Sequence, residues 1–246
     1  SEEVCVVKEK KIFHRAIEDV LRRRLKPWDR KRAHALGEIS MVQAKPAIRR
    51  IAVYCGSSGD VPGVYRSAAR DFGALLAEEG IGLVYGGGRV GLMGIVADAA
   101  LECGGEVIGV IPHRLQELEL GHEGVTELVV TSTMAERKVK MQELSQAAVA
   151  LPGGPGTLDE LFEEMVLTQL CYQSKPVGLL NVDGYYDHLL AFMEHMASQG
   201  FVRAPFDKLL NHGATPESLL GKIQSYEGYE LNLKAKLEMA GRLSSD

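Results

Sequence analysis

The chain has 246 residues, of which 46% are hydrophobic and 25% charged, and its net charge is −5. This apolar fraction can support a packed core, which excludes disorder as the overall state, and no stretch reaches the ~18 consecutive apolar residues of a membrane span. Charges recur within the first residues, so we expect no signal peptide and a cytoplasmic protein. The cysteines are widely spaced and the histidines lack ligand spacing, which predicts neither a disulfide framework nor a metal site.

Residues 1–50 differ in charge from the rest of the chain. They hold 14 lysines and arginines against 7 acidic residues, so they carry +7 and the remainder carries −12. Apolar residues at helical spacing predict an amphipathic helix over Lys11–Leu25, followed by a linker that ends near Pro46. The helix could pack on the core or on a partner subunit, contact a nucleic acid or a membrane surface, or be a targeting segment. Its acidic residues argue against the last of these.

We therefore expect three parts. Residues 1–48 form a basic N-terminal extension, 49–227 form the main domain, and 228–246 form a tail that is helical. A mildly acidic domain with a basic arm is not typical of a strong nucleic-acid binder, so we expect neither a nucleic acid nor a membrane as partner.

From residue 49 onward, short β-rich runs alternate with helical segments. The predicted strands are Arg50–Cys55, Gly82–Tyr85, Glu106–Ile111, Glu127–Thr131, Ala147–Leu151 and Val177–Leu180, with a weaker one near Lys208–Leu210. The predicted helices are Tyr65–Glu79, Leu92–Cys103, Met134–Gln146, Leu158–Tyr172, Tyr185–Gln199 and Pro216–Tyr226. This alternation predicts one α/β domain: a doubly wound, Rossmann-like parallel sheet with helices on both faces. Ligands of such folds bind beyond the carboxyl ends of the strands.

Two glycine-containing loops follow the first two predicted strands. The first, Cys55–Gly59, has small residues that let a ligand approach backbone N–H groups, although a plain turn explains it equally well. The second, Gly86–Gly94, formally matches the G-x-G-x-x-G dinucleotide fingerprint. No acid follows at the tip of the next strand, which disfavours an NAD(P) site, but Arg114 there suits a 2′-phosphate. Phosphate or nucleotide contact, NAD(P) binding and a structural turn all remain open for this loop.

The third loop, Pro152–Thr157, follows the apolar strand Ala147–Leu151 and opens a helix. Its glycines, the hydroxyl of Thr157 and the N-terminus of the helix together suit an anion. Thr157 could instead be the N-cap, with Glu160 closing a capping box. No lysine follows the glycines, so the loop is not a Walker phosphate loop, which argues against ATP hydrolysis.

Arg137 and Lys138 lie in the first turns of the predicted helix Met134–Gln146. Cations there oppose the helix dipole, so they are misplaced unless they meet an anion. The alternative is a solvated surface pair.

These motifs, in this order, resemble the Lonely Guy (LOG) family of cytokinin riboside 5′-monophosphate phosphoribohydrolases. The resemblance covers about residues 49–227 and includes the segments Pro176–Asn181 and Gly184–Tyr186. It implies hydrolysis of the N-glycosidic bond of a nucleoside 5′-monophosphate to the free base and ribose 5-phosphate, without a metal or organic cofactor. It also implies a homodimer or a larger homo-oligomer.

The family's paired catalytic residues fall on Arg137 and Glu160. The substrate-binding residues expected from the resemblance and from the loops are Ser57, Gly87, Gly88, Glu119, Met134, Lys138, Gly153, Gly154, Gly156 and Thr157. A Thr that contacts the nucleotide in the family is Val166 here, a departure that bears on the fine shape of the base pocket and not on the reaction.

The residue types suit this chemistry. Cleavage of a ribosyl C–N bond develops positive charge on the sugar, which a carboxylate such as Glu160 can stabilise while it orients water. Arg137 does not readily give up a proton, so we expect it to position the nucleotide and Glu160 and to stabilise the departing base. The main alternative is a carrier or sensor of a nucleotide or pterin-type cofactor on the same fold. A third hypothesis is an interaction protein whose basic arm binds nucleic acid.

Overall fold

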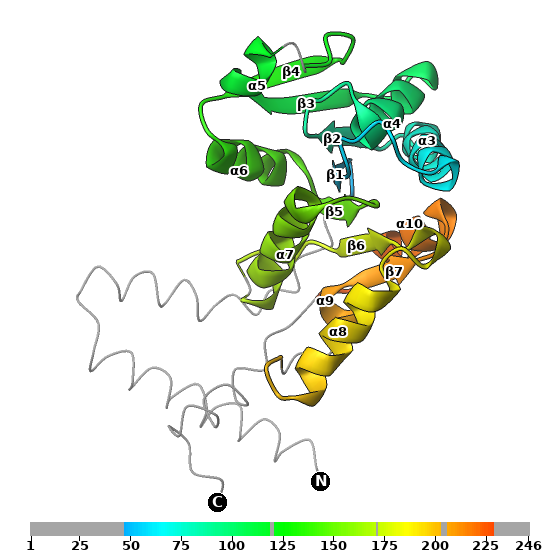
Figure 1. Ribbon diagram of the computed structural model, residues 1–246, viewed down its shortest axis with the longest axis vertical. Coiled ribbons are helices and arrows are strands. Elements are labelled where there is room, and N and C mark those ends of the chain that lie inside the picture. The colour runs from blue at the N-terminus through cyan, green and yellow to red at the C-terminus, as the bar shows by residue number, and fades with distance from the viewer. Residues whose placement is uncertain (1–46, 119–120, 171, 203–205, 229–246) are drawn as a thin grey trace, which may run out of the picture. The chain divides into compact units, whose positions relative to one another are not determined.

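The computed structural model describes residues 47–118, 121–170, 172–202 and 206–228. Its centre is a seven-stranded, entirely parallel sheet with the strand order β4-β3-β2-β1-β5-β6-β7 (Figure 1). The strands are β1 (Arg50–Tyr54), β2 (Gly82–Tyr85), β3 (Val107–Pro112), β4 (Glu127–Thr131), β5 (Ala147–Ala150), β6 (Val177–Leu180) and β7 (Asn211–Gly213). The order reverses between β1 and β5, and in doubly wound folds this switch point opens a crevice at the carboxyl edge of the sheet.

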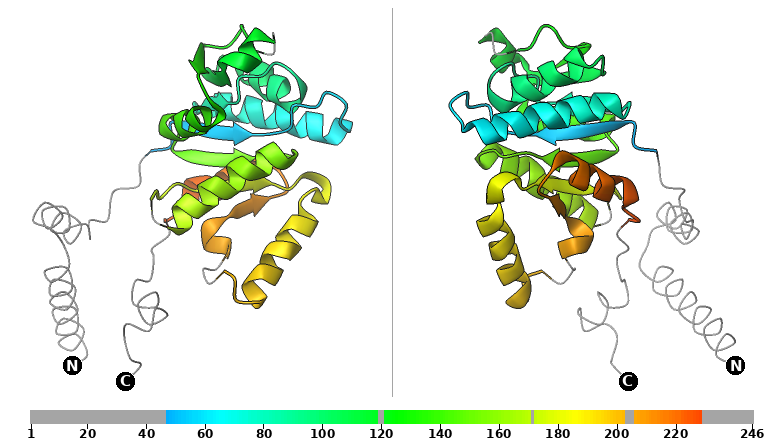
Figure 2. Two further views of the ribbon diagram at one scale, coloured as in Figure 1. Left: turned by 60° about the vertical axis from the view of Figure 1, so that its left-hand side comes forward. Right: turned by 90° about the vertical axis from the view of Figure 1, so that its right-hand side faces the viewer.

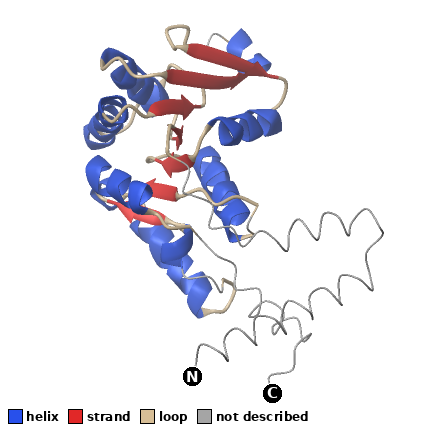
Figure 3. Ribbon diagram, turned by 180° about the vertical axis from the view of Figure 1, so that it is seen from behind, coloured by secondary structure: helices blue, strands red, loops and turns tan. Residues whose placement is uncertain are grey.

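Helices cover both faces of the sheet, as Figures 2 and 3 show. They are α3 (Gly63–Glu78), α4 (Gly91–Glu102), α5 (His113–Glu117), α6 (Met134–Leu144), α7 (Pro155–Gln169), α8 (Asp187–Ser198), α9 (Phe206–Leu209) and α10 (Pro216–Ser225), with a short 3-10 turn, η1 (Val182–Gly184). Buried side chains of α3, α4 and α10 share one core cluster, and those of α6 to α9 lie in two clusters that face the other side of the sheet. The predicted doubly wound α/β fold is confirmed.

Alternation along the central strands explains this two-sided core. Ile51 and Val53 of β1 belong to the cluster beneath α3 and α4, whereas Ala52 and Tyr54 belong to the cluster beneath α6. All four are almost completely buried. A strand covered on both faces reads as an unbroken apolar run because neither set of alternate side chains meets water.

Two short elements differ from the sequence-based expectations. The weak strand expected near Lys208–Leu210 is wrong in position, because Leu209 ends α9 and the strand β7 begins at Asn211. Leu209 and Leu210 are buried with α7 and α8, and a short apolar run buries its side chains equally well in either element. The other difference is α5, where the sequence suggested only the tip of a strand.

The predicted helix Lys11–Leu25 and the predicted C-terminal tail lie outside the described residues, apart from residue 228. Within the described ranges, no helix is long and apolar enough to span a membrane.

Candidate functional site

The three glycine-containing loops meet at the switch point of the sheet. The backbone N–H of Gly56, after β1, donates to the carbonyl of Pro152, after β5, at 3.1 Å. The carbonyl of Gly56 in turn accepts from the N–H of Leu92, at the start of α4, at 3.0 Å. The loops after β1, β2 and β5, which the sequence pattern singled out separately, therefore form one continuous backbone surface at the carboxyl edge of the sheet.

Arg137 and Glu160 form a buried ion pair beside these loops. Nη1 of Arg137 lies 2.6 Å from Oε1 of Glu160, and the two side chains are only 6% and 7% exposed. Nε of Arg137 donates to the carbonyl of Val110 in β3 at 3.1 Å. The pair therefore joins α6 to α7 and to the sheet, and the alternative that Arg137 is a solvated surface residue is wrong.

Capping hydrogen bonds at the start of α6 determine where Arg137 lies in the first turn of the helix. Oγ1 of Thr133 accepts from the N–H of Glu136 at 3.1 Å, and a carboxylate oxygen of Glu136 accepts from the N–H of Ser132 at 2.8 Å. This reciprocal capping fixes where α6 begins. It therefore also fixes the direction in which Arg137 leaves the helix.

Gly86 leaves the space that the guanidinium of Arg137 occupies. A Cβ atom built on Gly86 would overlap Nη2 of Arg137 and lie 3.2 Å from its Cζ. Gly86 is the first glycine of the G-x-G-x-x-G match. At this position a glycine is needed to make room for the Arg137 side chain and not to let a dinucleotide approach the backbone.

The electrostatics of the pair are set by burial. Removal from water raises the pKa of Glu160, and the nearby positive charge of Arg137 opposes this shift. Breaking such a pair by removing one partner leaves the other charge buried without compensation, which costs roughly 3–5 kcal/mol.

The N-terminus of α7 differs from the capping-box alternative. Gly154 is the N-cap and makes no side-chain cap hydrogen bond, and Pro155 is the first helical residue, a position that proline favours. Thr157 is therefore inside the first turn rather than at the cap, and Glu160 pairs with Arg137 rather than with the cap backbone. The uncapped helix start suits an anionic ligand because its first N–H groups lack partners in the helix.

Lys138 is held by two carboxylates of α7. Its Nζ lies 3.0 Å from Asp159 and 2.7 Å from Glu163, and its side chain is 20% exposed. Hydrogen bonding to Glu163 is the main cause that raises the pKa of Lys138. The positive charge expected to meet a substrate is thus balanced by two carboxylates of the protein.

The remaining predicted site residues lie around the same edge. Gly87 adopts φ +74°, and its carbonyl accepts from the N–H of His122 at 2.9 Å. Gly88 forms an isolated bridge with Gly121. Met134 is 51% exposed at the start of α6. Gly153 and the exposed Ser57 belong to the loops described above, and Gly156 lies in the first turn of α7. Glu119 lies outside the described residues.

Sequence reasoning assigned no role to two tyrosines that hold the third loop. The hydroxyl of Tyr185 donates to the carbonyl of Gly153 at 2.9 Å, and that of Tyr186 donates to the carbonyl of Leu151 at 2.7 Å. Their only sequence signal was their place in the Gly184–Tyr186 segment, which carried part of the family resemblance.

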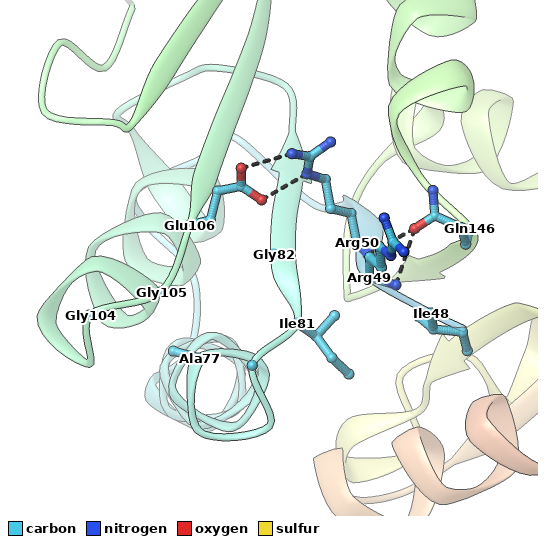
Figure 4. A pocket seen from close by; sticks show the side chains of 11 residues that line it. Ile48, Arg49, Arg50, Ala77, Ile81, Gly82, Gly104, Gly105, Glu106 and Gln146 are labelled. Carbon is cyan, nitrogen blue, oxygen red and sulfur yellow. Dashed lines mark hydrogen bonds and ion pairs between the residues drawn. The ribbon is translucent and has the colours of Figure 1, made fainter. Parts of the chain in front are cut away.

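A cavity of about 620 Å³ lies at the opposite edge of the sheet (Figure 4). Arg50 and Glu106 form a two-point ion pair there, at 2.7 and 2.8 Å. The side chain of Gln146 accepts from the backbone N–H groups of Arg49 and Arg50. This cavity is at the amino ends of β1 to β3, away from the glycine loops, and its polar groups are largely paired with one another.

Comparison with known proteins places this geometry in a family. A family model described as "Possible lysine decarboxylase" matches residues 93–223. The chain is 42% identical, over 201 residues covering 82% of each chain, to a probable cytokinin riboside 5′-monophosphate phosphoribohydrolase of Oryza sativa subsp. japonica. It is also 42% identical, over 193 residues, to a cytokinin riboside 5′-monophosphate phosphoribohydrolase of Arabidopsis thaliana, with 78% of this chain and 90% of the relative covered.

Solved structures show the same fold at lower identity. The molybdenum cofactor binding protein of Rippkaea orientalis is 24% identical with a TM-score of 0.56, over 74% of this chain and 98% of that one. The molybdenum cofactor carrier protein of Chlamydomonas reinhardtii is 22% identical with a TM-score of 0.55, over 72% and 96%. These two similarities establish the architecture only.

Substitution of Gly86 by alanine should break the ion pair, because the added methyl group and the guanidinium of Arg137 require the same space. Glu160 would then be buried without its partner, and we expect the free energy of unfolding at neutral pH to fall by roughly 3 kcal/mol. Urea unfolding measures this loss. Gly221→Ala is the matched control: Gly221 lies inside α10 with no atom within 4 Å of a built Cβ, so its replacement should stabilise by roughly 0.5–1 kcal/mol. Equal effects of the two substitutions would contradict the steric role of Gly86.

Proposed function

The chain belongs to the Lonely Guy family of cytokinin riboside 5′-monophosphate phosphoribohydrolases, and we propose that Arg137 and Glu160 are the residues with which it cleaves the N-glycosidic bond of a cytokinin nucleotide or of AMP. The observation that carries this proposal is the buried pair itself, 2.6 Å apart, beside glycine loops at the switch point of the sheet. A carboxylate and a guanidinium held together without solvent are costly to bury, so their presence at a ligand-binding edge favours a chemical role.

The reaction exchanges one bond for another. The bond from C1′ of the ribose to the base nitrogen breaks with its electron pair going to the base, and a water oxygen bonds to C1′. The proton that water loses ends on the departing base, giving free base and ribose 5-phosphate. The transition state carries positive charge on the sugar, as in glycoside hydrolysis.

Glu160 is the group suited to that charge. Its carboxylate can lie against the sugar and accept a hydrogen bond from the attacking water, which stabilises the cation and orients the nucleophile. Burial strengthens this interaction because water no longer screens it. Arg137 keeps the carboxylate ionised and oriented, and its remaining N–H groups can bind the nucleotide or the base as negative charge develops there.

The 5′-phosphate is best accommodated at the start of α7. The helix N-terminus, from Gly154 to Thr157, offers backbone N–H groups and the positive end of the dipole. Lys138 pairs with Asp159 of α7, so its ammonium group supplies a cation close to the same helix. Binding energy from the phosphate can then support distortion at the reacting bond, so nucleosides without phosphate should react poorly.

Two other functions fit less well. A carrier of a nucleotide or cofactor uses the same fold but has no need of a paired acid and arginine at the reacting edge. A pyridoxal-dependent decarboxylase needs a lysine free to form a Schiff base. Lys138 is bound by two carboxylates, and Nζ of Lys175 donates to the carbonyl of Gln142.

The outer face of α7 supports the proposal that the protein is a homodimer or a larger homo-oligomer. Pro155, Leu158, Phe162 and Val166 recur at helical spacing along this face. Together with Asp159 and Glu163 at its side, they line a shallow groove of about 410 Å³. Val166 is 45% exposed, although the opposite face of the same helix carries Glu160. Apolar stripes of this kind usually mark protein contacts. An interface here would place two catalytic helices side by side.

Val166→Glu should therefore produce a monomer, because a charge would be buried at the interface. Light scattering at micromolar concentration measures the mass. Val130→Glu is the matched control, since Val130 is 42% exposed on the edge strand β4, and it should leave the mass unchanged. A wild-type chain that is monomeric under these conditions would rule out the proposed interface.

The pH dependence of kcat/KM should reveal the environment of Glu160. Burial raises the pKa of this carboxyl, and only the ionised form can stabilise the sugar cation. Activity should thus be lost as pH falls through an apparent pKa above the ~4.3 of an ordinary glutamate. A pH–rate profile, with circular dichroism showing that the fold persists over the range, measures this limb. A limb at or below the ordinary value would contradict the role given to burial.

The decisive experiment is base release by Glu160→Gln. Wild-type protein is incubated with AMP or isopentenyladenosine 5′-monophosphate, and free base is followed by chromatography. The variant keeps its shape but loses the charge, so the rate should fall at least ~100-fold while calorimetry still detects nucleotide binding. Glu143→Gln, which replaces an exposed glutamate of α6 paired with Lys140, serves as control and should retain full activity. Wild-type protein that binds both nucleotides and cleaves neither would favour the carrier function.

A further inference from the structure

The buried face of α7 is polar over three turns. Glu160, Glu164 and Thr168 follow one another at intervals of four residues, so they share one face of the helix, and they are 6%, 0% and 1% exposed. Glu160 belongs to the proposed reaction. Glu164 does not, yet a fully buried carboxylate is costly unless other groups bind it.

Both carboxylate oxygens of Glu164 have a hydrogen-bond donor. The hydroxyl of Tyr54, the last residue of β1, donates to Oε1 at 2.8 Å. Nε2 of Gln173, in the loop after α7, lies 2.5 Å from Oε2 and also donates to the backbone carbonyl of Glu164 at 3.1 Å. Burial raises the pKa of Tyr54 well above its usual range, which keeps its hydroxyl protonated and able to donate.

The loop after α7 connects this site to the helix that carries Arg137. Oγ1 of Thr168 donates to the carbonyl of Lys175 at 3.4 Å. Nζ of Lys175 donates to the carbonyl of Gln142, in the last turn of α6. Burial lowers the pKa of Lys175, and the negative charge of the nearby Glu164 opposes this shift. We call Tyr54, Glu164, Thr168, Gln173 and Lys175 the Glu164 network.

The network therefore joins the three elements that determine the geometry of the catalytic pair. The first turn of α6 carries Arg137 and its last turn accepts from Lys175. The second turn of α7 carries Glu160, and the next turn carries Glu164. Strand β1, which ends in Tyr54, leads directly into the first loop of the switch point.

We propose that Glu164 is a positioning residue for hydrolysis, which sets Glu160 against Arg137 by fixing α7 to β1 through Tyr54 and to the C-terminal end of α6 through Gln173 and the loop that follows. This inference rests on the function proposed above. Directional hydrogen bonds suit the task, because an error of about 1 Å in the placement of a catalytic group can cost ~100-fold in rate. Glu164 touches no substrate in this arrangement and acts only through Glu160.

Two substitutions each remove one bond without emptying the core. Tyr54→Phe deletes only the hydroxyl, and Gln173→Met keeps the length of the side chain without its amide. For each, kcat should fall about tenfold, which corresponds to ~1.4 kcal/mol of transition-state stabilisation, while KM changes less than twofold because the phosphate and base contacts remain. Binding of AMP in a Glu160→Gln background should be unchanged for both variants.

A matched control separates positioning from general stability. Met165→Ala creates a cavity on the same helix, where Met165 is 4% exposed in the core beneath α8 and α9, and it should lower the melting temperature without lowering kcat at a temperature well below melting. The proposal is overturned if kcat is unchanged in Tyr54→Phe and Gln173→Met. It is also overturned if kcat falls equally in Met165→Ala, since the network would then be only structural. Wild-type protein that releases no base would instead contradict the proposed function, and this inference with it.

Discussion

The buried ion pair between Arg137 and Glu160 is the constraint on which the rest of the site depends. Two charges removed from water remain stable only if each finds its partner in good geometry. Three features of the chain accommodate this pair. Gly86 has no side chain where the guanidinium lies, the carbonyl of Val110 accepts a hydrogen bond from it, and the first turn of α6 is capped. These features lie far apart in the sequence, and each makes physical sense because the guanidinium must reach the carboxylate without solvent.

Helix α7 carries opposite chemistry on its two faces. The face toward the sheet holds Glu160, Glu164 and Thr168, all buried, whereas Val166 is exposed and its apolar neighbours Leu158 and Phe162 are half-buried. A helix that only covered the sheet would have the reverse pattern. Hydrogen bonds to β1, to α6 and to the loop that follows α7 hold α7 in place. The packing of Leu161 and Met165 adds to them. The outer stripe is then free to contact a second copy, close to the reacting groups.

The sequence predicted the fold well because each strand is a short apolar run and most strands are connected by a helix. This pattern is compatible with few topologies. It also identified the loops, since glycines before a helix have a recognisable spacing. It could not identify the partners across space. Tyr54 and Glu164 are 110 positions apart, and nothing local marks Tyr54 as polar in its environment. Thr157 is a residue type that suits an N-cap, but Pro155, a residue type favoured at the first helical position, already begins the helix.

Lys138 lies beside the start of α7, where we propose that the 5′-phosphate binds, and its own partners are two carboxylates of that helix. Asp159 and Glu163 hold its ammonium group at 3.0 and 2.7 Å, which restricts the conformations of the lysine side chain. These two carboxylates also offset its charge, which weakens attraction for anions in general. In the proposed function, a phosphate would therefore also bind the N–H groups at the start of α7. In the proposed function, selectivity for a nucleotide would follow from requiring both groups at once, with the sugar placed against Glu160, the carboxylate that pairs with Arg137.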